Sequence, residues 1–197
     1  KNNGIDRREF LKRLGAGTIV TTTALAGCKS DGATAGSAAG EVPTDKMTYR
    51  INQNTDDKVS ILGYGCMRWP TRKGADGRDE IDQETVNELV DYALAHGVNY
   101  FDTSPVYVQG KSETATGIAL SRHPRDSYFL ATKMSNFSNW SRENSIAMYE
   151  RSLRELKTDY FDYYVLHSVG GSIEDINRRY IDNGMLDFMI EERKAGR

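Results

Sequence analysis

The stretch YFDTSPVY, residues 100–107, begins with residue types that favour a β-strand and then turns abruptly polar at Asp102. Two other apolar stretches further along the chain end in the same way, one at Lys133 and one at His167. In a parallel sheet, the carboxyl ends of neighbouring strands meet at one edge, about 4.8 Å apart. We therefore expect an acid, an amine and an imidazole within mutual reach, at the end of a sheet where catalytic groups collect.

Each of these side chains also has a simpler interpretation. Asp102 could cap the loop after its strand, Lys133 could reach solvent, and His167 could be a satisfied core residue. Taken singly, these interpretations are at least as good as a functional one. Taken together, they must explain three coincidences of position and residue type, and this favours a shared site.

Strand patterns alternate with amphipathic helix patterns from residue 46 onward. We expect a hairpin of residues 49–51 and 58–61 that runs into a first strand ending at 63–65. Further strands are expected at 98–101, 128–132 and 161–168. Helices are expected at 82–96, at 112–120, after Ser141, and at 173–197 with a break at Gly184. This alternation predicts parallel βαβ units, either in a barrel of eight units or in an open doubly wound sheet. The open sheet usually has a glycine-rich turn after its first strand, and the segment GYGCMR (63–68) lacks the third glycine.

The opening stretch and GKSE (110–113) together resemble the signature of the aldo-keto reductase family. So do residues 58–67 (KVSILGYGCM), 131–133 (ATK) and 166–168 (LHS), in the same order and spacing. The resemblance implies an α/β TIM barrel that uses a nicotinamide cofactor, NADPH or NADH, to reduce an aldehyde or ketone. It also implies a catalytic tetrad, made of Asp102, Tyr107, Lys133 and His167.

The roles that the resemblance implies follow carbonyl chemistry. Hydride addition to a carbonyl carbon leaves an alkoxide, which would take a proton from Tyr107. A neighbouring ammonium stabilises a phenolate, so Lys133 would assist Tyr107, and Asp102 would hold Lys133. His167 would orient and polarise the carbonyl oxygen. The resemblance further implies four residues on the nicotinamide side of the cofactor: Gly65, Cys66, Met67 and Asp102, with Cys66 as a packing residue.

Residues 1–28 have the organisation of an export signal. Arg7 and Arg8 precede an uncharged run that is too short to be a permanent membrane span. We expect the twin arginines to engage the export machinery for folded proteins. The segment LAGC (25–28) resembles a bacterial lipobox, so we expect Cys28 to carry a lipid that anchors the protein at the cell envelope. Residues 29–45, rich in Gly, Ala, Ser and Thr, predict a flexible tether.

The formal net charge of −2 and the lack of a basic stripe argue against a nucleic-acid partner. Two cysteines supply neither a disulfide framework nor a metal or iron–sulfur site. His96 and His123 are expected at the surface. Trp69 and Trp140 follow strand ends, where they could line a pocket or pack their loops.

The resemblance covers four of the eight strands of the family's barrel, within residues 46–197. We therefore expect the N-terminal half of a barrel, an incomplete fragment with little activity alone. The match also resembles a bacterial branch that often carries a C-terminal ferredoxin-like domain, so any iron–sulfur cluster would lie there. A non-catalytic binding or redox-sensing module of the same fold, anchored at the envelope, is the alternative.

Overall fold

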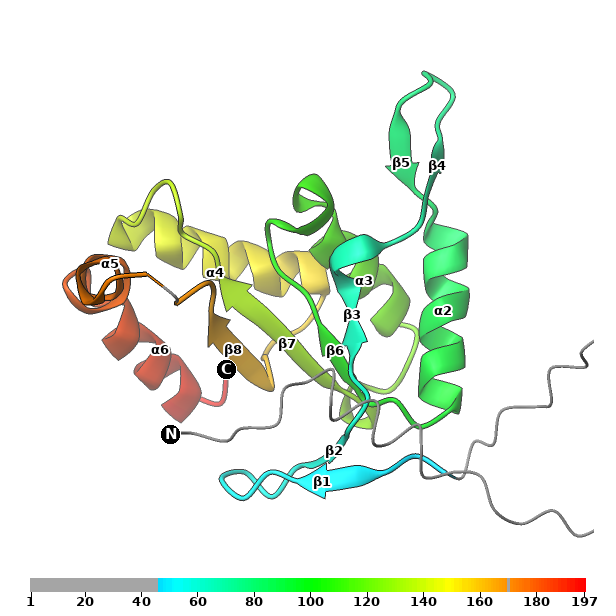
Figure 1. The fold of residues 1–197 in the computed structure, drawn as a ribbon, viewed down its shortest axis with the longest axis horizontal. Helices are drawn as coiled ribbons and strands as arrows, with labels where there is room; N and C mark the ends of the chain where they lie inside the picture. Colours follow the sequence, from blue (N-terminus) through cyan, green and yellow to red (C-terminus); the bar gives the residue numbers. More distant parts are fainter. Residues whose placement is uncertain (1–45, 170) are drawn as a thin grey trace, which may run out of the picture. The chain divides into compact units, whose positions relative to one another are not determined.

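A computed structural model describes residues 46–169 and 171–197 (Figure 1). The expected signal segment, tether and lipidated Cys28 lie outside the described residues. Each helix within the described part of the chain is too short or too polar to cross a bilayer.

A parallel four-stranded sheet forms the centre of the fold, in the order β3-β6-β7-β8. Its strands are β3 (Tyr64–Gly65), β6 (Tyr100–Asp102), β7 (Phe129–Met134) and β8 (Tyr163–Leu166). The spatial order of the strands follows their order along the chain. The predicted strand–helix alternation is therefore confirmed, and each crossover joins adjacent parallel strands.

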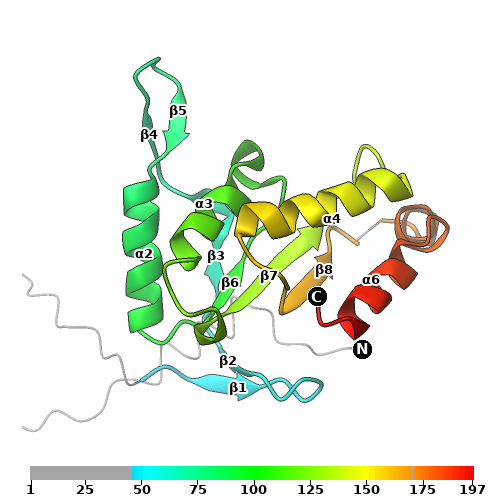
Figure 2. The ribbon, with the colours of Figure 1, turned by 180° about the vertical axis from the view of Figure 1, so that it is seen from behind.

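Three helices cover one face of this sheet: α2 (Gln83–Ala95), α3 (Ser112–Leu120) and α4 (Arg142–Leu156). Figures 1 and 2, which view the molecule from opposite sides, both place these helices on the same side of the strands. A doubly wound sheet carries helices on both faces and reverses its strand order at a switch point. Helices on one face and sequential strands are instead the arrangement of a sheet that curls toward a barrel.

Local signals explain where the helices begin and how closely they pack. Ser141 caps α4, and its Oγ accepts a hydrogen bond from the backbone N–H of Asn144 at 3.2 Å, as its residue type predicts. Gly117 lets α3 approach the end of α4, because a Cβ at that position would lie 2.3 Å from the carbonyl oxygen of Glu155. The core between sheet and helices includes fully buried Phe101, Leu130 and Val90.

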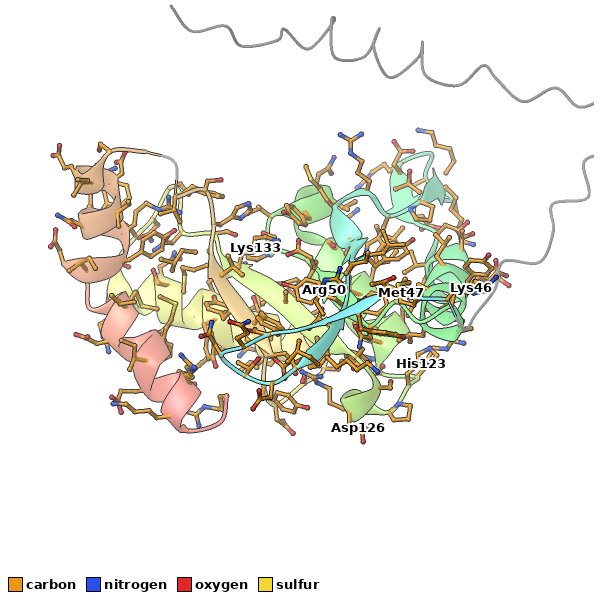
Figure 3. The ribbon with its side chains drawn as sticks, turned by 60° about the horizontal axis from the view of Figure 1, so that its bottom comes forward. Lys46, Met47, Arg50, His123, Asp126 and Lys133 are labelled. Carbon is orange, nitrogen blue, oxygen red and sulfur yellow. The ribbon has the colours of Figure 1, made fainter. Side chains whose placement is uncertain are left out.

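The N-terminal hairpin differs partly from its prediction. It consists of β1 (Tyr49–Ile51) and β2 (Lys58–Ser60), paired antiparallel as expected. However, the chain bends at residues 61–62 between β2 and β3, where Ser60 Oγ donates to the carbonyl oxygen of Leu62 at 2.8 Å. Figure 3 shows this hairpin crossing the end of the sheet where the strands begin. The Tyr163 hydroxyl at the start of β8 anchors it by donating to Asp57 at 2.7 Å.

Two further elements were not predicted from the sequence. A second hairpin, of β4 (Thr71–Lys73) and β5 (Asp79–Ile81), projects beyond the N-terminal end of α2 (Figure 1). The expected C-terminal helix is divided into α5 (Ile173–Ile176), a π-helical turn η4 (Asn177–Ile181) and α6 (Met185–Lys194). The predicted break at Gly184 is confirmed, and this residue has a φ of 67°.

Candidate active site

The three strand ends bring their ionisable residues together. Lys133, near the end of β7, donates hydrogen bonds from Nζ to Asp102 Oδ1 and, at 2.8 Å, to the carbonyl oxygen of Thr103. The Lys133 side chain is only 12% exposed and that of Asp102 is 33% exposed, so the ion pair is partly shielded from water. Figure 3 labels Lys133 on its strand. The expected association of Asp102 with Lys133 is present in the structure.

Tyr107 reaches the same place from the loop after β6. The Lys133 ammonium lies 4.8 Å from the centre of the Tyr107 ring. The Tyr107 and His167 rings meet edge to face, with centroids 5.8 Å apart and planes at 88°. All four residues proposed for the tetrad therefore lie in one cluster.

A left-handed turn follows Tyr107 and directs the chain into α3. Val108 and Gln109 have φ values of 49° and 55°, in a region that non-glycine residues rarely occupy. Such a conformation is costly for a β-branched residue such as Val108, and backbone strain of this kind often accompanies functional sites. The turn is closed by the N–H of Lys111, which donates to the carbonyl oxygen of Val108 at 3.1 Å.

His167 follows β8, and its surroundings favour a neutral ring. Its pKa is lowered from the ordinary value of 6.5, first by burial and then by the positive charges of Lys133 and Arg179. The Asp102 carboxylate opposes this shift without reversing it. The His167 carbonyl oxygen accepts from Arg179 Nη2 at 3.0 Å and from the Tyr180 hydroxyl at 3.3 Å, which fixes the backbone of the strand end.

Several residues at this site were not among those singled out in the sequence. The Nδ1 atom of His167 lies 2.7 Å from Ser135 Oγ and 3.2 Å from Ser104 Oγ. The Phe137 ring lies 5.0 Å from the imidazole, between centroids. Side-chain alternation along a strand offered one signal, because Ser135 is two residues from Lys133 and so faces the same side. Arg179 gave no such signal, because a buried arginine in a helical pattern looks like any other polar position.

The residues expected near a nicotinamide ring occupy different environments. Gly65 pairs with Asp102 in the sheet, and a Cβ there would meet nothing within 4 Å. Met67 is 53% exposed in the 3₁₀ turn η1 (Cys66–Arg68). Cys66 is fully buried and offers no surface to a ligand. Burial also raises the pKa of its thiol to about 12, consistent with a packing role.

The two tryptophans and His123 lie in different surroundings. Trp69 is buried, and its indole N–H donates to Thr116 Oγ1 at 3.0 Å, so it packs its loop. Trp140 is 37% exposed, with the Arg178 guanidinium 4.2 Å from its ring centre. His123, expected at the surface, is partly buried, with its side chain 24% exposed and its Nε2 2.6 Å from Asp91 Oδ1.

Two hollows lie near β8. One, of about 190 Å³, adjoins the cluster and is lined by residues that include Phe137, Val169 and Arg179. The other, of about 430 Å³, lies between β8 and α6 and is lined mainly by apolar and aromatic groups that include Tyr164 and Met189. Neither hollow is lined by any of the four clustered residues, but the smaller one is lined by Phe137 and Arg179, which both contact His167.

Comparisons with known proteins agree with this arrangement. The model of the "Aldo/keto reductase family" matches residues 61–196. The uncharacterized oxidoreductase YqkF of Bacillus subtilis is 35% identical over 138 residues, which cover 66% of this chain and 41% of that protein. D-arabinose 1-dehydrogenase of Saccharomyces cerevisiae is 38% identical over 99 residues, covering 46% of this chain and 29% of that protein.

A solved structure shows the same fold. It is the aldo-keto reductase AKR11C1 from Bacillus halodurans in its holo form, 33% identical, with a TM-score of 0.54 over 70% of this chain and 45% of that one. The chain spans less than half the length of each of these relatives. The parallel sheet with its helices is thus an α/β fold of the TIM-barrel type, and this chain belongs to the aldo/keto reductase family.

Proposed function

We propose that the protein is an NAD(P)H-dependent oxidoreductase that reduces an aldehyde or ketone to an alcohol. One observation carries this proposal: the Asp102–Lys133 ion pair lies against the ring of Tyr107, which in turn meets the ring of His167. An ammonium held beside a phenol is suited to proton transfer from that phenol. A non-catalytic binding or redox-sensing module of the same fold would have no need of this combination.

In the proposed reaction, a bound nicotinamide supplies the hydride that adds to the carbonyl carbon. Tyr107 donates its hydroxyl proton to the developing alkoxide. Lys133 stabilises the phenolate that remains, and Asp102 with the Thr103 carbonyl holds the Lys133 ammonium in position. His167, as a neutral ring, donates a hydrogen bond to the carbonyl oxygen and polarises it.

The cofactor would lie along the sheet edge at Gly65, Met67 and Asp102. The lack of any atom within 4 Å of a Cβ at Gly65 supports this, because a ligand could approach the backbone there without obstruction. Since Cys66 is fully buried, we assign it to packing beneath this edge. The cofactor is NADPH or NADH, and the substrate is an aldehyde or a ketone.

Substitution of Tyr107 by Phe tests the proposal directly. The variant should reduce carbonyl substrates roughly 10²–10⁴-fold more slowly, because proton donation by a positioned side chain contributes about this much. Tyr92→Phe is the control, since Tyr92 is 54% exposed on α2. The assay should use the complete gene product with each nicotinamide in turn. Equal rates for Tyr107→Phe and the wild type would contradict the role of Tyr107 and favour the non-catalytic alternative.

We further propose that the four strands are the first half of an eight-stranded barrel, and that these residues alone have little activity. The apolar hollow beside β8 supports this, because it exposes groups that a further strand and helix would cover. The greater length of the relatives supports it too. The 197-residue chain should therefore bind NADPH weakly in a fluorescence titration, and tight stoichiometric binding would refute the proposal. Any iron–sulfur cluster would need cysteines outside these residues.

We also propose that the protein is exported and anchored at the bacterial envelope by a lipid on Cys28, after recognition of Arg7 and Arg8. The order of twin arginines, apolar run and lipobox supports this. Cells that express the wild type in the presence of a labelled fatty acid should incorporate label into the protein, and Cys28→Ser should not. Replacement of both arginines by lysine should retain the precursor in the cytoplasm. Labelling of the Cys28→Ser variant would contradict the anchor.

A further inference from the structure

Two buried serine hydroxyls connect the loop of Tyr107 with the ring of His167. Ser104, two residues after β6 ends, is fully buried, and Ser135, just after β7, is 3% exposed. Their Oγ atoms are 3.0 Å apart. Ser135 Oγ lies 2.7 Å from Nδ1 of His167, and Ser104 Oγ lies 3.2 Å from the same atom. The backbone N–H of Val106 points at Ser104 Oγ over 3.4 Å.

We infer that this Ser104–Ser135 relay fixes the tautomer of His167, so that Nδ1 is bare and Nε2 carries the proton. The inference deepens the proposed function, because a ring in this tautomer presents Nε2–H as a donor to a carbonyl oxygen. Ser104 and Ser135 are then positioning residues, which act through the imidazole.

A count of the available hydrogens supports this direction. Val106 N–H donates to Ser104. In the inferred tautomer the Ser104 hydroxyl donates to Ser135 over 3.0 Å, and the Ser135 hydroxyl donates to Nδ1 of His167 over 2.7 Å. In this series of hydrogen bonds, each donated hydrogen has an acceptor, and each serine oxygen accepts one hydrogen bond. Neutral hydrogen bonds aligned in this way strengthen one another inside a protein.

The opposite tautomer satisfies the same atoms less well. If Nδ1 carried the proton and donated to Ser135, the Ser135 hydroxyl could donate to Ser104 Oγ at 3.0 Å, but the Ser104 hydroxyl would then have no acceptor among the described residues. Otherwise the Ser135 hydroxyl would have to turn to the carbonyl oxygen of Lys133 at 3.3 Å. That contact is beyond the usual range for a hydroxyl donor, whereas 2.7 Å between Ser135 Oγ and His167 Nδ1 is typical of one. The lowered pKa of His167 keeps the ring neutral, so the choice between tautomers is meaningful near neutral pH.

His96 is an internal reference with the opposite arrangement at Nδ1. Its Nδ1 lies 2.7 Å from the backbone carbonyl oxygen of Tyr92, which can only accept. The Nδ1 of His96 must therefore carry a proton when it makes this bond. One chain thus contains two imidazoles whose Nδ1 atoms should be in opposite states.

Nitrogen-15 spectra of the imidazole rings in the 197-residue chain test the inference without any turnover. In the wild type, Nδ1 of His167 should show the shift of a bare ring nitrogen and Nε2 that of a protonated one, whereas Nδ1 of His96 should be protonated. A protonated Nδ1 on neutral His167 overturns the inference, whatever happens to the variants.

Variants then test the relay itself. The double variant Ser104→Ala/Ser135→Ala should show averaged nitrogen shifts for His167, because both tautomers become populated, while His96 stays unchanged. Ser135→Thr keeps a hydroxyl and should retain the wild-type pattern. Ser60→Ala is the matched control, because Ser60 is equally buried at the other end of the strands. A wild-type spectrum in the double variant contradicts the relay.

Kinetics separate this inference from the proposed function. In the complete protein, Ser135→Ala should lower kcat/KM by about tenfold, the effect of one lost hydrogen bond, and Ser135→Thr should restore it. If the wild type reduces no carbonyl compound, the proposed function fails, while the nitrogen spectra still decide the tautomer. If reduction is normal in the wild type and Ser135→Ala is fully active, the positioning role is refuted.

Discussion

Lys133 donates to Asp102 across the pairing of β7 with β6, and the same ammonium lies 4.8 Å from the centre of the Tyr107 ring. The two charges of this pair affect the neighbouring His167 in opposite directions. The Lys133 charge lowers the pKa of His167, and the Asp102 charge raises it. Substitutions that remove one charge or the other should therefore shift the pKa of His167 in opposite directions.

Lys133→Met should raise the pKa of His167, because a positive charge beside the ring is removed. The pKa should still remain below 6.5, since burial is the largest cause of the lowering and is retained. Proton spectra of the ring across a pH series measure this. Lys73→Met, on the exposed strand β4, is the control and should leave the midpoint unchanged. A lower pKa in Lys133→Met would contradict the assigned contact.

Asp102→Asn should lower the pKa of His167 further, because the carboxylate that raises this pKa is neutralised. The same titration measures it, with Asp79→Asn on the exposed strand β5 as the control. The Lys133 ammonium also loses its carboxylate, so carbonyl reduction should fall in the complete protein. If both substitutions shifted the pKa of His167 in the same direction, they would act by rearranging the site and not through their charges.

Glu113 should make the stability of the fold depend on pH. This carboxyl is fully buried between Thr132 and Ser152, which hydrogen-bond to it, and burial raises its pKa to about 7 from 4.5. Between these values the folded state holds a proton that the unfolded state has released. The free energy of unfolding should therefore decrease as pH rises from 4.5 to 7, by roughly 3 kcal/mol from this group alone.

Urea unfolding of the wild type and Glu113→Gln at several pH values measures this contribution. The variant should lose the decrease, and exposed Glu150→Gln should keep it. The comparison is needed because His167 acts in the opposite direction. Its lowered pKa contributes stability that is present above pH 6.5 and is lost as pH falls below that value. Parallel pH profiles for the wild type and Glu113→Gln would contradict the prediction.

Two glycines should respond differently to the same change. Gly117→Ala should destabilise the fold by roughly 1–3 kcal/mol or more, because its Cβ would overlap the backbone of α4. Gly65→Ala should change stability by no more than about 0.5 kcal/mol, because its backbone is extended and its surroundings are open. In the complete protein Gly65→Ala should nevertheless weaken NADPH binding, measured by titration. An unchanged affinity for NADPH would contradict the placement of Gly65 in the cofactor site.

The sequence predicted those features that depend on near neighbours along the chain. Alternation of apolar strands with helical patterns predicted parallel βαβ units, and the ionisable residues at the ends of three strands predicted the cluster of Asp102, Lys133 and His167. Ser141 and Gly184 marked a helix start and a break, because capping and positive φ are properties of single residues. The exposed β4–β5 hairpin was missed, since its charged residues follow no apolar period.

Tertiary structure alone decided how the cluster is held. The hydrogen bonds between Arg179 and the His167 carbonyl, and between Ser135 and the His167 ring, join residues that are 12 and 32 positions apart. Ser104, Ser135 and Arg179 are ordinary residue types whose importance arises from what they touch. The sequence by itself determined which chemical groups stand at the strand ends, because strand and helix periods are local. The charge state of His167 and the direction of its hydrogen bonds depend on burial and on distant partners, which only the folded chain brings together.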